Sequence, residues 1–316
     1  MRSKEELKTF YNSEILPHLD ELEELRKFQL RRQTFIGIAF LASVGLGLAT
    51  FMPFMIIIFL LVSLILYFIF YGFKRKRPDF KTQYKDTVIR KIIQFISPEL
   101  VYSSHQFISN TKFSNSGIFL QQVDIYNGED LVQGMIDKTT VEFCELHTQD
   151  RTTDSKGRTH YVTIFKGIFY IADFHKHFIG KTYVLSDFGE RFMGFFGKMF
   201  QDMNIMRPDV VRLENPEFEK YFVVYATDQV EARYILSPSF MEKLLAFRKR
   251  VNTTIQLSFI ESQVYLAIPM KKNLFEPSLR KTVKRFEDVE EYYDQVCFCT
   301  DIVEELNLNT RIWSKQ

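Results

Sequence analysis

The chain has 316 residues, 46% of them hydrophobic and 25% charged, which is enough for one large domain or two small ones. Its net charge of +2 argues against a general nucleic-acid-binding protein, so no nucleic acid is expected as a partner. The three cysteines are an odd number without the spacing of a disulfide framework, which favours free thiols and a reducing compartment.

Residues 1–33 are predicted to form an amphipathic helical arm. Ser3 and Glu6 have the spacing of a capping box at a helix start. Leucines then recur near helical spacing, and Pro17 is expected to break or bend the helix. This charged segment differs from the short basic stub and apolar run of a signal peptide, so no cleavable signal is predicted.

Residues 34–73 contain no charged residue and no histidine. One straight helix of this length would be about 60 Å long, whereas a bilayer core is about 30 Å thick. Proline is favoured in the first turn of a helix and poorly tolerated inside one. Pro53 therefore divides the run into helices over about 34–50 and 53–73, which predicts a transmembrane hairpin. A re-entrant loop that does not fully cross is the alternative.

Basic residues flank this run on both sides, which predicts that both of its ends lie in the cytoplasm. The sequence therefore predicts a multi-pass protein of the cell (cytoplasmic) membrane with both termini cytoplasmic. Contact with anionic lipid headgroups is predicted for Arg31, Arg32, Lys74, Arg75, Lys76 and Arg77. The alternatives for the second cluster are a solvated charge run and a nucleic-acid patch.

Residues 74–97 form a basic collar followed by an amphipathic helix, and residues 98–316 are predicted to be a cytoplasmic α+β domain. Segments 139–148 and 160–174 alternate in the manner of strands, and the polar stretch between them indicates a hairpin loop. Segment 181–186 continues the sheet, and Asp187 marks a helix start.

The C-terminal part follows the same pattern. Two short strands are predicted at 221–227 and 231–237, with Glu231 and Arg233 paired on one strand face. Ser237 and Pro238 open a helix, 254–270 is a hairpin, and a final helix covers about 286–306. These strand pairs predict a mixed α+β fold with antiparallel pairs, in contrast to a doubly wound nucleotide-binding fold.

The run NPEFEKYFVVYATDQVEARYILSPSFMEKL (215–244), together with FKGIFY (165–170) and the predicted membrane hairpin, carries a family resemblance. The chain resembles bacterial membrane proteins catalogued as domain of unknown function 3137. The resemblance implies the architecture and a bacterial cytoplasmic membrane, and it adds no catalytic residue.

Asp173, His175 and His177 alternate, so on a strand all three would share one side and could hold a metal. His147 or His160 on a neighbouring strand would supply a further ligand. The competing interpretation is a polar outer face on a half-exposed strand, and it is favoured. No metal and no cofactor are therefore predicted.

No catalytic motif is present: the sequence has no G-x-S-x-G elbow, P-loop, G-x-G-x-x-G or H-E-x-x-H. Cys144 lies in a strand pattern and is interpreted as a small core residue. The predicted function is a non-enzymatic, membrane-anchored cytoplasmic binding or scaffold protein, with the lipid bilayer and a protein or second copy as partners. The alternative is a membrane-associated enzyme with its site in the α+β domain, and a channel would need an oligomeric pore.

Overall fold

A computed structural model describes residues 3–49, 57–58, 60–62, 64–65, 68, 79–154, 156–174, 176–186, 207–306 and 308. The chain divides into two compact units. The first combines Met1–Ile92 with Phe275–Asp294, and the second combines Ile93–Leu274 with Gln295–Gln316. Each unit is therefore built from two segments that are far apart in the sequence.

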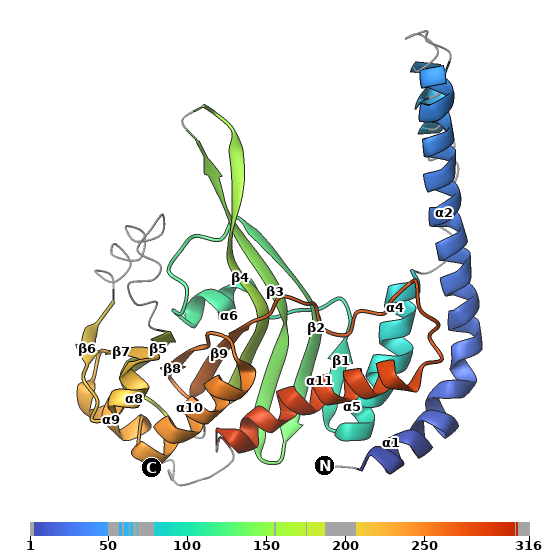
Figure 1. Cartoon of the computed structure of the whole chain (residues 1–316). Helices are drawn as coiled ribbons and strands as arrows, with labels where there is room; N and C mark the ends of the chain where they lie inside the picture. The colour runs from blue at the N-terminus through green and yellow to red at the C-terminus, as the bar shows by residue number, and fades with distance from the viewer. Residues whose placement is uncertain are drawn as a thin grey trace. The chain divides into compact units, whose positions relative to one another are not determined.

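The first unit begins with a nearly continuous helical segment (Figure 1). Its elements are α1 (Lys4–Phe10), the π-helical turn η1 (Tyr11–Ile15), the 3-10 turn η2 (Leu16–His18) and α2 (Leu19–Ala49). The capping box is confirmed, because Ser3 Oγ accepts the Glu6 N–H at 3.2 Å and the Glu6 carboxylate accepts the Ser3 N–H at 2.7 Å. Pro17 lies in η2, which confirms the predicted interruption at this position.

The rest of the first unit supplies the partners that bury the apolar side of this segment. They are α4 (Phe80–Tyr84), the π-helical turn η3 (Lys85–Ile89), the first residues of α5 (Arg90–Ile96) and the first half of α11 (Phe286–Glu305). Tyr11 packs edge-on against Phe286 with ring centroids 5.4 Å apart, and Tyr84 packs in the same way on Tyr292 at 6.0 Å. The core of this unit therefore consists of helix–helix contacts rich in aromatic rings.

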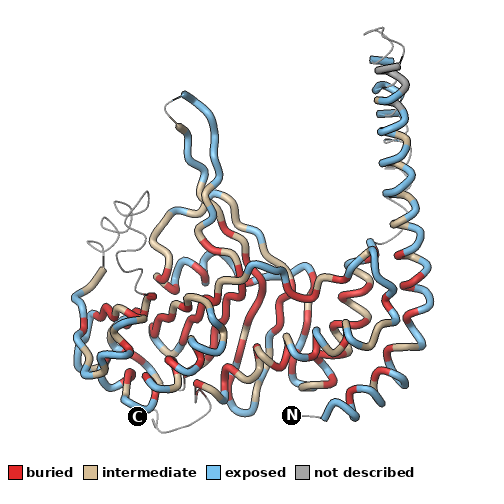
Figure 2. Tube along the Cα trace, viewed as in Figure 1, coloured by how far each residue is buried: buried red, intermediate tan, exposed pale blue. Residues whose placement is uncertain are grey.

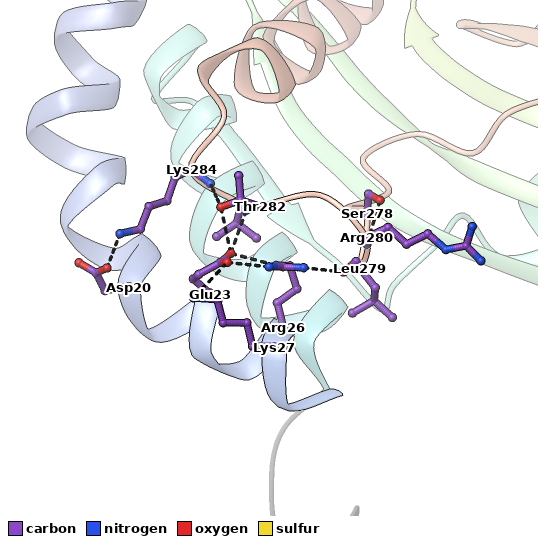
Figure 3. Close-up of polar contacts among 10 residues, drawn as sticks. Asp20, Glu23, Arg26, Lys27, Ser278, Leu279, Arg280, Thr282 and Lys284 are labelled. Carbon is purple, nitrogen blue, oxygen red and sulfur yellow. Dashed lines mark hydrogen bonds and ion pairs between the residues drawn. The ribbon is translucent and has the colours of Figure 1, made fainter. Parts of the chain in front are cut away.

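A polar cluster fixes α2 to the segment that precedes α11 (Figure 3). The Glu23 carboxylate accepts the Val283 N–H at 3.1 Å and the Thr282 hydroxyl at 3.2 Å. Arg26 donates to the Leu279 carbonyl at 2.7 Å. These contacts join residues more than 250 positions apart and explain why Phe275–Asp294 belongs to the first unit.

The predicted transmembrane hairpin is overturned. Among the residues that the structure describes, none of the helices combines the length and the apolar content that a membrane crossing requires. Residues 34–49 do not form a helix of their own, because they continue the charged helix that begins at Leu19. Pro53 and most of 53–73 lie outside the described residues. This finding contradicts the predicted membrane hairpin and the predicted multi-pass membrane localisation, and both predictions are wrong.

The described residues of the second unit form a nine-stranded antiparallel sheet with strand order β1-β2-β3-β4-β9-β8-β5-β7-β6 (Figure 1). The strands are β1 (Leu100–Ser103), β2 (Ile125–Ile136), β3 (Thr139–Thr153), β4 (Thr159–Asp173), β5 (Lys181–Ser186), β6 (Asp209–Val211), β7 (Phe222–Ala226), β8 (Gln256–Ile260) and β9 (Gln263–Pro269). The predicted strands at 139–148, 160–174 and 181–186 and the predicted hairpin at 254–270 are confirmed, and so are the antiparallel pairs of an α+β fold.

Helices cover both faces of this sheet. The described helices of the second unit are α6 (Asn110–Asn115), α8 (Pro216–Glu219), α9 (Gln229–Ile235), α10 (Pro238–Val251), the end of α5 and the second half of α11. On one face, Phe113 of α6 packs on Phe169 with centroids 5.0 Å apart. On the other, Tyr170 stacks on Phe143 at 5.4 Å and lies beside Cys299 of α11. Because successive side chains of β4 point to opposite faces of the sheet, they pack into two separate cores, one on each face.

Segment 231–237 is not the predicted strand, because α9 occupies it. Asp228 caps this helix: its carboxylate accepts the Val230 and Glu231 N–H groups at 2.9 and 3.0 Å. Glu231 and Arg233 do not pair on a strand face. Glu231 instead accepts the Gly180 N–H at 2.8 Å. The Asp228 cap stabilises α9 as a helix, although the composition of this segment favours a strand. The helix start predicted at Asp187 lies outside the described residues.

Candidate functional site

The hairpin of β3 and β4 extends well past the rest of the sheet (Figure 1). The pairing of β2 with β3 ends at Ile125 and Gln149. The pairing of β3 with β4 continues from there to Thr153 and Thr159. We call residues 150–164 the β3–β4 arm. Most of the arm is exposed, as Figure 2 shows in pale blue.

Asp154 organises the tip of the arm. Its carboxylate accepts the Lys156 and Arg158 N–H groups at 2.9 and 2.8 Å, and it also accepts the Arg158 Nε–H at 2.9 Å. His160 Nε2 lies 3.3 Å from the same carboxylate. These donors hold the pKa of Asp154 below its ordinary value, with the Arg158 backbone N–H as the largest cause. The tip is therefore a defined turn, and Gly157 supplies the positive φ of +76° that the turn needs.

The two long edges of the arm differ. On the β3 side, the Arg151 N–H donates to the Asp124 carboxylate at 2.9 Å, so part of that edge is covered. On the β4 side, β9 pairs only with Gly167–Asp173, and the Met270 N–H bonds the Lys166 carbonyl. Within the described residues, no strand pairs with the outer edge of Thr159–Phe165. The arm thus presents an open strand edge on its β4 side.

The sequence predicted only a polar hairpin loop between 148 and 160. The structure extends both strands into that segment, to Thr153 and from Thr159. The threonines on both sides of the Asp154–Arg158 turn are β-branched and could have indicated strands. The polar composition of the segment favoured a loop instead. The arm is therefore the surface feature that the sequence patterns missed.

Asp173 and His177, two residues of the disfavoured metal interpretation, do not share a strand. β4 ends at half-buried Asp173, and the chain turns so that the Phe174 N–H donates to the Ser262 carbonyl at 2.8 Å. His177 is exposed in the following connection, and His175 lies outside the described residues. His147 lies 3.4 Å from Thr163 Oγ1, and His160 lies in the arm. Asp173 thus ends β4 and His177 lies in the connection after it, and the expectation that no metal binds these residues stays a prediction.

The basic residues predicted to contact lipid are described only in part. Arg31 and Arg32 lie on α2, exposed and half-buried respectively. The second group, Lys74, Arg75, Lys76 and Arg77, lies outside the described residues. Contact of these six residues with anionic lipid stays a prediction.

A carboxylate cluster that the sequence did not indicate lies where β2 bulges beside β3. The carboxylate oxygens of Glu129, Asp130 and Glu145 lie within 4.8 Å of one another. Oxygen ligands of this kind suit hard cations. The protein itself supplies donors, because Tyr102 donates to Asp130 at 2.5 Å and the Leu274 N–H donates to Glu145 at 2.7 Å. The cluster is therefore explained as a polar junction, and no metal is assigned to it.

Two of the buried thiols, Cys144 and Cys299, are poor nucleophiles. Burial raises the pKa of Cys144 to about 12, although its sulfur accepts the Ile108 N–H at 3.3 Å. Burial also raises the pKa of Cys299 well above its ordinary value. Because the thiolate is the reactive form, neither residue is suited to covalent catalysis near neutral pH. This agrees with the interpretation of Cys144 as a core residue.

A small pocket lies at the β6–β7 end of the sheet. It is lined by Val210–Leu213, Glu219 and Phe222–Val224, and its volume is about 90 Å³. Pockets that hold a small-molecule ligand measure roughly 300–1,000 Å³. This pocket is therefore too small to serve as a substrate site.

Comparisons with known proteins give a family match for part of the chain. No curated protein matches it. A crystal structure of the mycobacterial trehalose monomycolate transport factor A covers 69% of this chain and 94% of its own, with 8% identity and a TM-score of 0.31, which supports no inference. The prediction drawn from the 215–244 run is confirmed: residues 163–308, from β4 through α11, match the family described as "Protein of unknown function (DUF3137)".

Proposed function

We propose that the protein is a non-enzymatic binding or scaffold protein that holds a partner protein on the β3–β4 arm. The single observation that carries this proposal is the arm itself: a paired, exposed ribbon whose tip is ordered by Asp154. Exposed residues that a rigid scaffold holds in place commonly serve recognition.

The composition of the arm suits contact with another protein. Tyr161, 56% exposed, and Arg151 are cross-strand partners on one face of the ribbon. Tyrosine and arginine are enriched at protein–protein contacts, because each combines a large apolar surface with hydrogen-bonding groups. A projecting ribbon also presents both of its faces to a partner.

The test is to shorten the arm without disturbing the sheet. Because Gln149 and Thr163 are directly opposite, Asp150–Val162 can be replaced by Asn-Gly, which closes a two-residue hairpin and removes most of the arm. We expect a partner that co-purifies with the full chain to be lost with the shortened chain. Circular dichroism and thermal unfolding of the two chains should agree. Recovery of the same proteins with both chains, or of none with either, contradicts the proposal.

A further inference from the structure

We propose that the outer edge of β4 in the arm, Thr159–Ile164, binds an extended segment of another protein as an added antiparallel or parallel strand. This inference rests on the proposed function, because it names how the arm holds its partner. An edge strand presents alternating N–H and C=O groups, and a peptide that adds to the edge satisfies them. The Lys166 carbonyl accepts the Met270 N–H and Phe165 is buried, so the open edge ends at Ile164.

The composition of this edge favours strand addition. Residues 159–165 read THYVTIF, which are β-branched or aromatic except for His160. Such residues fit a strand, whereas natural edges that avoid pairing carry lysine or proline. Tyr161 and Thr163 are exposed, Val162 and Ile164 are half-buried and Phe165 is buried, so the edge is open to solvent over Thr159–Ile164. Lysine and proline are absent from 159–165.

The charged residues beside the open edge favour another protein over a second copy of this chain as the bound partner. Arg158 precedes the open edge and Lys166 follows it. Antiparallel pairing of two copies around Val162 would place each Arg158 opposite the Lys166 of the other copy, and like charges directly opposite are destabilising. Lys156 adds positive charge at the tip, where Asp154 is the only nearby carboxylate among the described residues of the turn. The edge therefore fits a partner segment that is apolar at its centre and acidic at its ends.

The experiment measures hydrogen–deuterium exchange of the full chain with three synthetic peptides. The probes are ETVTVTE, its charge-reversed form KTVTVTK, and EPVPVPE, whose prolines cannot complete a ladder of hydrogen bonds. We expect ETVTVTE to slow exchange in 159–164 and to leave 167–173 unchanged, because β9 already pairs with the latter. EPVPVPE should give no protection.

A charge-swapped variant provides the matched control. In the double variant Lys156→Glu/Lys166→Glu, which keeps the Asp154–Arg158 pair, the preference between ETVTVTE and KTVTVTK should reverse, with a change of about tenfold in relative affinity. Reversal of preference cannot arise from a variant that merely fails to fold. Absence of protection in 159–164 with every peptide overturns strand addition. Concentration-dependent dimerisation that protects 159–164 without peptide also overturns it, because the occupant is then a second copy.

Different results would contradict the proposed function and the proposed strand addition. If the shortened arm loses a native partner while ETVTVTE leaves the β4 edge unprotected, the arm binds its partner by another surface, and only strand addition is wrong. If a native partner binds equally to the shortened chain, the proposed function itself is wrong.

Discussion

Glu23 and Arg26 form a two-pronged ion pair on α2, in which Arg26 Nε lies 2.9 Å from Oε2 and Nη2 lies 2.6 Å from Oε1. The two side chains are only 9% and 8% exposed. The same carboxylate accepts the Val283 N–H, so the pair fixes a segment from the far end of the sequence (Figure 3). Burial makes this pair important to the first unit, because either charge would be costly without the other.

The first prediction concerns removal of one partner. Arg26→Ala removes both hydrogen bonds of the buried pair and leaves Glu23 only the longer contact with Lys27 Nζ at 3.7 Å, so we expect a loss of about 3 kcal/mol in the stability of the first unit. Lys249→Ala, which breaks the exposed pair with Glu217, is the matched control and should have little effect. Hydrogen exchange in 279–285 would report the loss directly. Equal effects of the two substitutions would contradict the argument.

The second prediction is a pH dependence with a defined sign. The hydrogen bond from Arg26 lowers the pKa of Glu23 from 4.5 to about 2. A lowered folded-state pKa contributes stability above the unfolded value, and that stability is lost as pH falls from about 4.5 toward 2. The amount is about 3 kcal/mol. Urea unfolding at pH 7, 4 and 2.5 should show this loss, and Glu23→Gln should reduce the pH dependence of the unfolding free energy by about the same amount.

The third prediction concerns a buried phenol in the second unit. Tyr170 Oη has no hydrogen-bond partner among the described residues, and its residue is fully buried. Removing a buried polar group that lacks a partner recovers its desolvation cost, so Tyr170→Phe should stabilise the protein by about 1 kcal/mol. Tyr102→Phe is the control, because it removes the bond to Asp130 and should destabilise. Thermal unfolding distinguishes the two directions.

The fourth prediction concerns a glycine where β4 meets β9. Gly167 has φ +152°, and a Cβ there would lie 2.1 Å from the Ile268 carbonyl oxygen. Gly167→Ala must shift the backbone of a paired strand and should cost about 3 kcal/mol or more. Gly157→Ala, at a positive φ with open space around it, should cost only about 1 kcal/mol. Similar losses for the two variants would show that the close approach is not what requires glycine.

The fifth prediction addresses the tip of the arm. Asp154→Ala removes the acceptor for the Lys156 and Arg158 N–H groups, so exchange in 154–160 should become faster while the sheet stays protected. Asp154→Asn keeps one acceptor oxygen and should have a smaller effect. Unchanged exchange in both variants would mean that Asp154 does not order the tip.

The sequence alone determined the elements whose signals are local. The capping box at Ser3, the interruption at Pro17 and the β8–β9 hairpin each depend on residues a few positions apart, and all are present. The carboxyl of Asp228 also acts locally, but the β-favouring residues after it concealed a helix in the sequence pattern. The uncharged run at 34–73 is long and apolar enough in sequence to predict membrane helices. In the structure, residues 34–49 instead continue a helix that begins at Leu19.

The tertiary structure decided what depends on residues distant in sequence. Glu23 meets Val283 across 260 positions, and β9 stops short of the arm and leaves one edge of β4 open. No local pattern encodes either relationship, because strand order and helix docking are set by the free energy of the whole buried core. The open edge of Thr159–Ile164, on which the proposed mode of binding rests, exists only because of where β9 ends.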